Sequence, residues 1–177
     1  MEKDINGVTI QLEEGNIAAQ EDVQAVVNAA NAELKTGGGV AGAIHRAAGP
    51  KLAAAGEEYA PIEPGEAVIT PGFNLPNSHV IHCLGPVYGR DKPEDKLLAS
   101  CYNRALELAE EHGLVSVAFP AISTGAFGYP PEEAAEVALE TVIERTDELE
   151  TVETIRFVLF DEQALETHRQ KLNELLD

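Results

Sequence analysis

The chain has 177 residues, of which 44% are hydrophobic and 24% are charged. This apolar content is typical of a globular protein rather than a disordered one, and the length suits one domain with a substantial core. Twelve Lys and Arg against 31 Asp and Glu give a net charge of −19. A charge of this sign argues against nonspecific binding to nucleic acid or to an anionic membrane surface.

The sequence also lacks the marks of several other protein classes. No apolar run is long enough to cross a bilayer, and the first ten residues have no basic segment followed by an apolar one. We therefore expect a cytoplasmic protein. Cys83 and Cys101 lie in apolar surroundings without further Cys or His at metal-ligand spacing. We expect both thiols to be buried and inert, with no metal site and no cofactor.

The acidic residues are spread through the chain, often as Glu-Glu pairs, and lysine is scarce. A surface of one sign is destabilised by self-repulsion unless salt screens it. We therefore hypothesise a salt-rich cytoplasm, as in a halophile. The alternative is an ordinary acidic protein.

Predicted strands and helices alternate along the chain. The strands are indicated by alternating or continuous apolar residues, at residues 7–12, 25–27, 66–70, 79–84, 115–119 and 155–160. The helices are indicated by apolar stripes or Ala-rich stretches, at residues 41–55 (with a break at Gly49-Pro50), 94–112, 131–145 and 163–176. This alternation predicts an α/β layer fold with a largely parallel sheet. Ligands of such sheets bind beyond the carboxyl ends of the strands, so the loops after strands are the candidate site.

The first such loop carries three consecutive glycines, Gly37–Gly39, in front of a helix. Their backbone N–H groups can approach a ligand closely, and the helix N-terminus adds a positive dipole end, which together suit a phosphate. A flexible surface loop is the alternative. The same stretch matches G-x-G-x-x-G, but residues 28–35 separate it from the preceding strand. That spacing argues against a nicotinamide-dependent dehydrogenase.

The second loop, residues 120–131, offers the hydroxyls of Ser123 and Thr124 and places Gly125 and Gly128 where positive φ is allowed. Two glycine loops on one sheet edge would hold a diphosphate from both sides. A third loop begins at Phe160, at the end of the last predicted strand. Its ring could stack on a base, or it could be a core phenylalanine.

Several segments resemble, in the same order, those of the macro domain family, the ADP-ribose-binding fold. They include EGNI (14–17), VVNAAN (26–31), GGGVAGAIHRAAG (37–49) and AFPAISTGAFGYP (118–130). The resemblance implies a single macro domain over residues 1–177. It also implies a three-layer α/β/α sandwich around a mixed, largely parallel sheet.

The resemblance further implies a set of ADP-ribose-binding residues: Asn16, Ile17, Asn28, Asn31, Gly38, Gly39, Val40, Ser123, Thr124, Gly125, Ala126, Phe127 and Phe160. Phe160 would stack on adenine, and Asn31 would bind the distal ribose. Asn16 stands where the family usually has an Asp that bonds the adenine amino group. We expect the Asn16 side-chain oxygen to take over that bond, with weaker selectivity for adenine.

The expected function is ADP-ribose binding with hydrolysis of ADP-ribose derivatives: ADP-ribose 1″-phosphate, O-acetyl-ADP-ribose or ADP-ribosylated Asp and Glu. Ala41 replaces an Asp of the hydrolytic subgroup, so Asn31 and bound water would have to support the reaction, with His45 as a candidate acid–base group. The alternative for His45 is a helix histidine with satisfied hydrogen bonds. The alternative function is a module that binds ADP-ribose without turnover. The expected partners are ADP-ribose-containing metabolites and ADP-ribosylated proteins.

Overall fold

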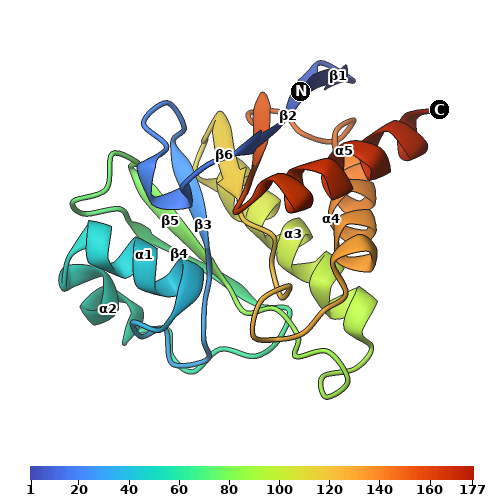
Figure 1. The fold of residues 1–177 in the computed structure, drawn as a ribbon. Coiled ribbons are helices and arrows are strands. Elements are labelled where there is room, and N and C mark those ends of the chain that lie inside the picture. Colours follow the sequence, from blue (N-terminus) through green and yellow to red (C-terminus); the bar gives the residue numbers. More distant parts are fainter.

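A seven-stranded sheet runs through the computed structural model, which describes residues 1–177 (Figure 1). The strands are β1 (Glu2–Ile5), β2 (Val8–Glu14), β3 (Ala25–Ala29), β4 (Ala67–Pro71), β5 (His79–Cys83), β6 (Ser116–Phe119) and β7 (Thr154–Leu159). Their order across the sheet is β1-β2-β7-β6-β3-β5-β4. The five inner strands pair in parallel, while the edge strands β1 and β4 are antiparallel to their neighbours. The predicted mixed, largely parallel sheet is confirmed.

Helices cover both faces of this sheet. They are α1 (Gly39–Ala48), α2 (Lys51–Gly56), α3 (Glu94–Glu111), α4 (Pro131–Arg145) and α5 (Glu162–Leu176), with a short 3₁₀ helix η1 (Ile17–Ala19). Helices α1 and α2 lie on one face, and α3, α4 and α5 lie on the other (Figure 1). This arrangement confirms the three-layer α/β/α sandwich. None of the helices is long and apolar enough to span a bilayer.

The two faces bury cores of different size. The larger core, between the sheet and α3–α5, is centred on the aromatic rings of Tyr102, Phe119 and Phe157, which are at most 1% exposed. The smaller core, beneath α1 and α2, includes Val26, Ile44 and Val80. Burial of these side chains is the main force that holds the layers together. Both cysteines are buried and free, as predicted.

The structure differs from the predicted elements mainly at the N-terminus and in the first helix. Strand β1 (EKDI) was not predicted, because its side chains are mostly exposed and carry no apolar pattern; it is held by pairing with β2. The helix predicted at 41–55 begins at Gly39 and is divided by Gly49, whose φ is +89°. A residue in that conformation ends a right-handed helix, and glycine adopts it without a Cβ penalty.

Because the five inner strands are parallel, their carboxyl ends meet at one edge of the sheet. The segments that leave this edge are Gly15–Ile17 after β2, the glycine loop after β3, residues 120–130 after β6 and Phe160-Asp161 after β7. Loops that are far apart in the sequence are therefore neighbours in space.

Candidate functional site

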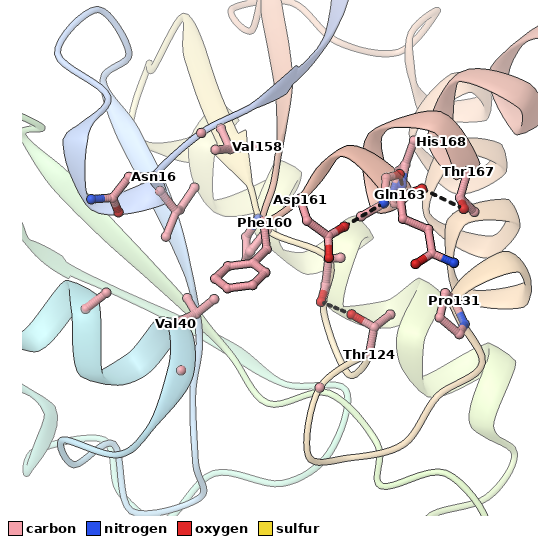
Figure 2. Close-up of a pocket in the computed structure, with 18 of the residues that line it drawn as sticks. Asn16, Val40, Thr124, Pro131, Val158, Phe160, Asp161, Gln163, Thr167 and His168 are labelled. Carbon is pink, nitrogen blue, oxygen red and sulfur yellow. Dashed lines mark hydrogen bonds between the residues drawn. The ribbon is translucent and has the colours of Figure 1, made fainter.

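A cleft of about 720 Å³ opens at this edge, between the N-termini of α1 and α5 and the loops after β2, β6 and β7 (Figure 2). Seven of the predicted ligand-binding residues line it: Asn16, Ile17, Gly39, Val40, Thr124, Gly125 and Phe160. It is also lined by residues that were not predicted, among them Arg46, Asp161, Gln163, Thr167 and His168. No three His, Cys, Asp or Glu side chains of the chain are grouped as metal ligands would be.

Phe160 is the most exposed large apolar side chain of the molecule, at 92%. It follows the buried Leu159 at the end of β7 and precedes Asp161, whose side chain caps α5 by accepting from the Ala164 N–H at 2.8 Å. Figure 2 shows its ring standing between Asn16 and Val40 on one side and the start of α5 on the other. The alternative of a core phenylalanine is therefore wrong, and an open aromatic face is available for stacking.

Asn16 caps the 3₁₀ helix η1. Its side-chain Oδ1 accepts a hydrogen bond from the Ala18 N–H at 2.9 Å. Its backbone carbonyl accepts from the Gln20 Nε2 at 2.9 Å and from the Ala19 N–H at 3.0 Å. The oxygen that we expected to bond adenine is thus already engaged within the turn.

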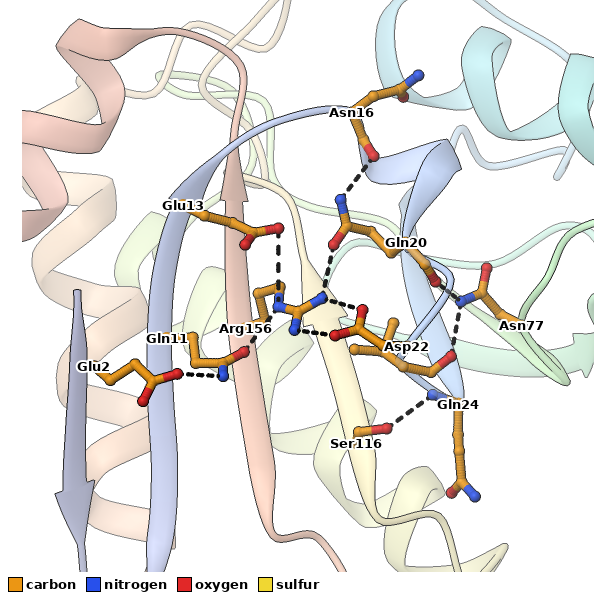
Figure 3. Close-up of polar contacts among 11 residues, drawn as sticks. Glu2, Gln11, Glu13, Asn16, Gln20, Asp22, Gln24, Asn77, Ser116 and Arg156 are labelled. Carbon is orange, nitrogen blue, oxygen red and sulfur yellow. Dashed lines mark hydrogen bonds and ion pairs between the residues drawn. The ribbon is translucent and has the colours of Figure 1, made fainter.

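Beneath the Asn16 turn lies a polar network centred on the buried Arg156 of β7 (Figure 3), whose ion-pair partner Asp22 is exposed. The Arg156 guanidinium donates to Gln11 Oε1 at 2.8 Å, to Gln20 Oε1 at 2.9 Å and to both Asp22 oxygens at 2.7 and 2.8 Å. This hydrogen-bonded ion pair lowers the pKa of Asp22 to about 2, and the same carboxylate raises the pKa of Arg156. Sequence analysis missed the network; its one signal was a single Arg inside the apolar strand IRFVLF.

The glycine loop brings the start of α1 to the cleft. Gly38 is the N-cap and offers no side chain, so the first N–H groups of the ten-residue helix have no side-chain cap. Gly39 has φ of +54°, and a Cβ on Gly42 would lie 2.5 Å from the Gly37 carbonyl oxygen. Both positions therefore require glycine. The predicted anion-binding geometry, in which backbone donors face the cleft, is compatible with this loop.

The second loop is strained at Ser123, whose φ is +67°. Positive φ was expected at Gly125 and Gly128, but it occurs at Ser123 and Gly128. A non-glycine residue in that region is costly and persists when its surroundings hold it. Ser123 is 7% exposed, and its hydroxyl has no partner within the chain. Thr124, which does line the cleft, donates its hydroxyl hydrogen to the Ala121 carbonyl at 3.0 Å.

Six of the predicted binding residues lie outside the lining of the cleft: Asn28, Asn31, Gly38, Ser123, Ala126 and Phe127. The Asn31 side chain bridges its own loop. Its Nδ2 donates to the Lys35 carbonyl at 2.8 Å, and its Oδ1 accepts from the Lys35 N–H at 3.0 Å. Phe127 packs partly buried against a small cluster that includes Leu84. Ala126 and Gly38 are exposed loop residues.

His45 also lies outside the cleft lining. It is 4% exposed, and neither ring nitrogen has a hydrogen-bond partner within the chain, so it is not the satisfied helix histidine of the alternative. Its ring centroid is 6.5 Å from that of His82. Asn28 Nδ2 donates to His82 Nδ1 at 3.1 Å, which leaves His82 Nε2 to donate to Thr70 Oγ1 at 3.0 Å. Burial lowers the pKa of His45, and burial followed by the nearby His45 lowers the pKa of His82 to about 3.

The chain is similar to known proteins both in sequence and in fold. The family model described as Macro domain matches residues 27–138. A macro domain-containing protein of Methanosarcina mazei is 44% identical over 174 residues, covering 98% of this chain and 92% of the relative. The O-acetyl-ADP-ribose deacetylase of Klebsiella pneumoniae is 48% identical over 163 residues, covering 89% and 93%. A mutant of the Oceanobacillus iheyensis macrodomain, solved with ADPR, is 40% identical with a TM-score of 0.94, covering 99% and 98%.

Proposed function

Because the chain belongs to the macro domain family, we propose that its cleft binds ADP-ribose. The observation that carries this proposal is the ring of Phe160, 92% exposed at the end of β7 and facing the same cleft as two glycine loops. An aromatic ring that open is ready to stack on a base, whereas glycine N–H groups suit a diphosphate. The Oceanobacillus iheyensis macrodomain solved with ADPR supports the proposal by its similar fold.

In this proposal the ligand runs along the carboxyl edge of the sheet. Phe160 and Ile17 enclose the adenine, and the start of α1 together with Thr124 and Gly125 holds the diphosphate. The distal ribose lies towards Asn31, Gly38 and Phe127, with Ser123 and Ala126 in the adjoining loop. Asn28 acts from below, through its hydrogen bond to His82.

We further propose that the protein hydrolyses ADP-ribose derivatives, of which O-acetyl-ADP-ribose, ADP-ribose 1″-phosphate and ADP-ribosylated Asp or Glu are the candidates. The 48% identity to an O-acetyl-ADP-ribose deacetylase supports the first of these. Asp161 is the one carboxylate that lines the cleft, and it is engaged as the cap of α5. The rate would therefore depend on fixed donors aimed at developing charge and on orientation of water, rather than on a strong base.

One observation favours the alternative of binding without turnover. Ala41 is 5% exposed and offers no acid–base group, and His45 lies outside the cleft lining. A protein of this kind would recognise ADP-ribosylated proteins without removing the modification.

Titration calorimetry with ADP-ribose, AMP and NAD in molar KCl tests binding. We expect tight binding of ADP-ribose and weak binding of AMP and NAD. AMP lacks the diphosphate and the distal ribose, and in NAD the distal ribose carries nicotinamide at its anomeric carbon. Similar weak heats for all three would contradict the proposal. Incubation with O-acetyl-ADP-ribose, followed by chromatography, then separates an enzyme from a binding module.

We propose that the setting is a salt-rich cytoplasm, because 31 acidic residues face 12 basic ones. Salt screens the repulsion among exposed carboxylates and should raise the midpoint of thermal unfolding. Melting curves from low to molar KCl test this. A midpoint that stays constant over that range would contradict it.

A further inference from the structure

A second hollow lies outside the cleft, between the first turn of α3 and one face of α4, two helices that pack against each other (Figure 1). Its volume is about 280 Å³, and it is lined by five carboxylate side chains, two tyrosines and one valine. None of these carboxylates forms an ion pair with a basic side chain. The hollow therefore concentrates negative charge and has no basic side chain in its lining.

The sequence of α4 places three of the carboxylates on one face of the helix. Glu133, Glu136 and Glu140 are three and four residues apart, so their side chains follow one another along α4. The helix dipole favours an acid in the first turn, which accounts for Glu133 and, in α3, for Glu94 and Asp95. Glu136 and Glu140 lie beyond that turn, where like charges one turn apart destabilise a helix. A positive group in the hollow would relieve this repulsion.

Tyr129 distinguishes this hollow from an ordinary acidic surface. Its side chain is 3% exposed and lines the hollow, and its hydroxyl makes no hydrogen bond within the chain. The pKa of Tyr129 is raised to about 12, first by burial and then by Asp95, Glu133 and Glu94. The hydroxyl therefore lies close to three carboxylates of the lining. Because buried hydroxyls are normally hydrogen-bonded, this one is available to a group that enters the hollow.

Tyr88 adds an open aromatic surface beside the carboxylates. Its backbone N–H donates to the Phe127 carbonyl at 2.9 Å, which fixes its loop to the loop that carries Tyr129. The two tyrosine rings meet edge to face, with centroids 4.9 Å apart. Tyr88 is 42% exposed, and its hydroxyl donates to Glu133 Oε2 at 3.4 Å. Aromatic rings and carboxylates together attract a cation by cation–π contact and by charge-assisted hydrogen bonds.

The spacing of the carboxylates favours a broad cation over a compact one. No three of them are grouped as the ligands of a metal ion would be. A guanidinium is planar, has five N–H donors and stacks on aromatic rings, so it can meet separated carboxylates and a phenol at the same time. An ammonium directs its three donors from a single point.

We propose that this hollow binds a guanidinium group on an alkyl chain, carried by a small molecule or by an arginine side chain of a partner protein. The hydroxyl of Tyr129 accepts from the guanidinium, the carboxylates of α3 and α4 neutralise it, and Tyr88 offers its ring. The inference goes beyond the proposed function and does not depend on it, because the residues that line the hollow are separate from those that line the cleft.

Titration calorimetry of the full chain with n-butylguanidinium in molar KCl tests the inference. At this salt concentration the Debye length is about 3 Å, so attraction to the acidic surface as a whole is screened and contact binding remains. We expect saturable binding with a midpoint below about 20 mM, as suits a single small group. n-Butylammonium has the same charge and chain, and we expect it to bind at least about threefold more weakly.

Two substitutions test the residues that carry the inference. Tyr129→Phe removes only the unpartnered hydroxyl, and Glu133→Gln removes one nearby charge. We expect each to weaken n-butylguanidinium binding by about threefold to tenfold, the effect of one hydrogen bond. Tyr59→Phe, at an exposed tyrosine, and Glu144→Gln, at an exposed position of α4, lie outside the hollow and should keep the wild-type midpoint. Melting curves show that each variant is folded.

A blocked tripeptide, acetyl-Gly-Arg-Gly-amide, distinguishes the two sources of the guanidinium. Binding at least as tight as that of n-butylguanidinium supports an arginine of a partner protein, whereas weaker binding supports a small molecule. Absence of saturable n-butylguanidinium binding, or equal binding of n-butylammonium, would overturn the inference. An unchanged midpoint in both Tyr129→Phe and Glu133→Gln would also overturn it. All of these outcomes leave the proposed binding of ADP-ribose standing.

Discussion

The proposed binding site has a base end, at Asn16 and Phe160, and a far end, at Asn31, Gly38 and Phe127. These two ends are built in different ways. At the base end, a charged side chain from the sheet makes four hydrogen bonds and holds the Asn16 turn through Gln20. The far end carries the glycine loop, and three buried residues near it have polar atoms without partners in the chain: Asn28 Oδ1, Ser123 Oγ and both ring nitrogens of His45. The base end has one such atom, Asn77 Oδ1. Buried polar atoms without partners lower stability, whereas a bonded network makes a turn rigid. The base end is therefore held mainly by a hydrogen-bonded network with an ion pair, whereas the far end contains most of the buried polar atoms that lack a partner in the chain.

The largest change in the free energy of unfolding is expected from a substitution at the base end. Arg156→Met leaves the buried Gln20 oxygen and the partly buried Gln11 oxygen without their donor, and we expect the free energy of unfolding to fall by about 2 kcal/mol. ADP-ribose affinity should also fall, because the Asn16 turn loses its support. Urea unfolding and calorimetry in molar KCl measure both effects.

The matched control for this change is Arg169→Met, which removes an exposed ion pair with Glu166. Such pairs contribute about 0–1 kcal/mol. If Arg156→Met cost no more than this control, the base end would not depend on its network.

Acid should weaken the far end through His82. His82 has a folded pKa of about 3, lowered by burial from 6.5. Its contribution to stability is complete above pH 6.5 and is lost as the pH falls towards 3, because the unfolded state binds the proton more readily. Between pH 6.5 and 5 we expect a loss of about 2 kcal/mol from this residue.

The difference between wild type and His82→Gln isolates the His82 contribution, since other buried histidines titrate in both proteins. The Arg156–Asp22 pair at the base end should respond only at much lower pH. Asp22, with a pKa lowered to about 2 from 3.8, keeps its contribution above pH 3.8 and loses it as the pH falls through 2. Equal acid slopes in the two proteins would contradict the assignment to His82.

Phe160→Ala separates ligand binding from folding at the base end. The ring is 92% exposed, so its removal should leave unfolding nearly unchanged. Loss of stacking should weaken ADP-ribose binding by about 1.5 kcal/mol, or roughly tenfold. Phe73→Ala, at another exposed phenylalanine outside the cleft, is the control. Equal affinity in the two variants would remove Phe160 from the site.

Some parts of the fold and of the cleft leave a pattern in the sequence, and others do not. Inner strands and long helices were found because buried faces leave a periodic pattern, and the glycine loops were found because close backbone approach requires glycine. The exposure of Phe160 was not predictable from IRFVLF, since an apolar run does not show where the chain turns out of the sheet. The Arg156 network was missed because its partners Gln11, Gln20 and Asp22 lie 134–145 residues away in the sequence. They come together because β2 pairs with β7, β7 pairs with β6, and β6 pairs with β3.

The smallest expected change in ligand affinity is at Asn31, which tests the far end. Its two hydrogen bonds to Lys35 close an exposed loop, so Asn31→Ala should lower the free energy of unfolding by less than about 1 kcal/mol. A Cβ on Gly37 would lie 3.3 Å from Asn31 Nδ2, so this side chain borders the glycine run proposed to hold the diphosphate. Loosening it should reduce turnover of O-acetyl-ADP-ribose about tenfold while ADP-ribose affinity changes less than about threefold, because misplacement of a reacting group costs more in rate than in binding. Asn173→Ala, at an exposed position of α5, is the control. Equal losses of turnover and affinity in Asn31→Ala would show that Asn31 only holds the loop together.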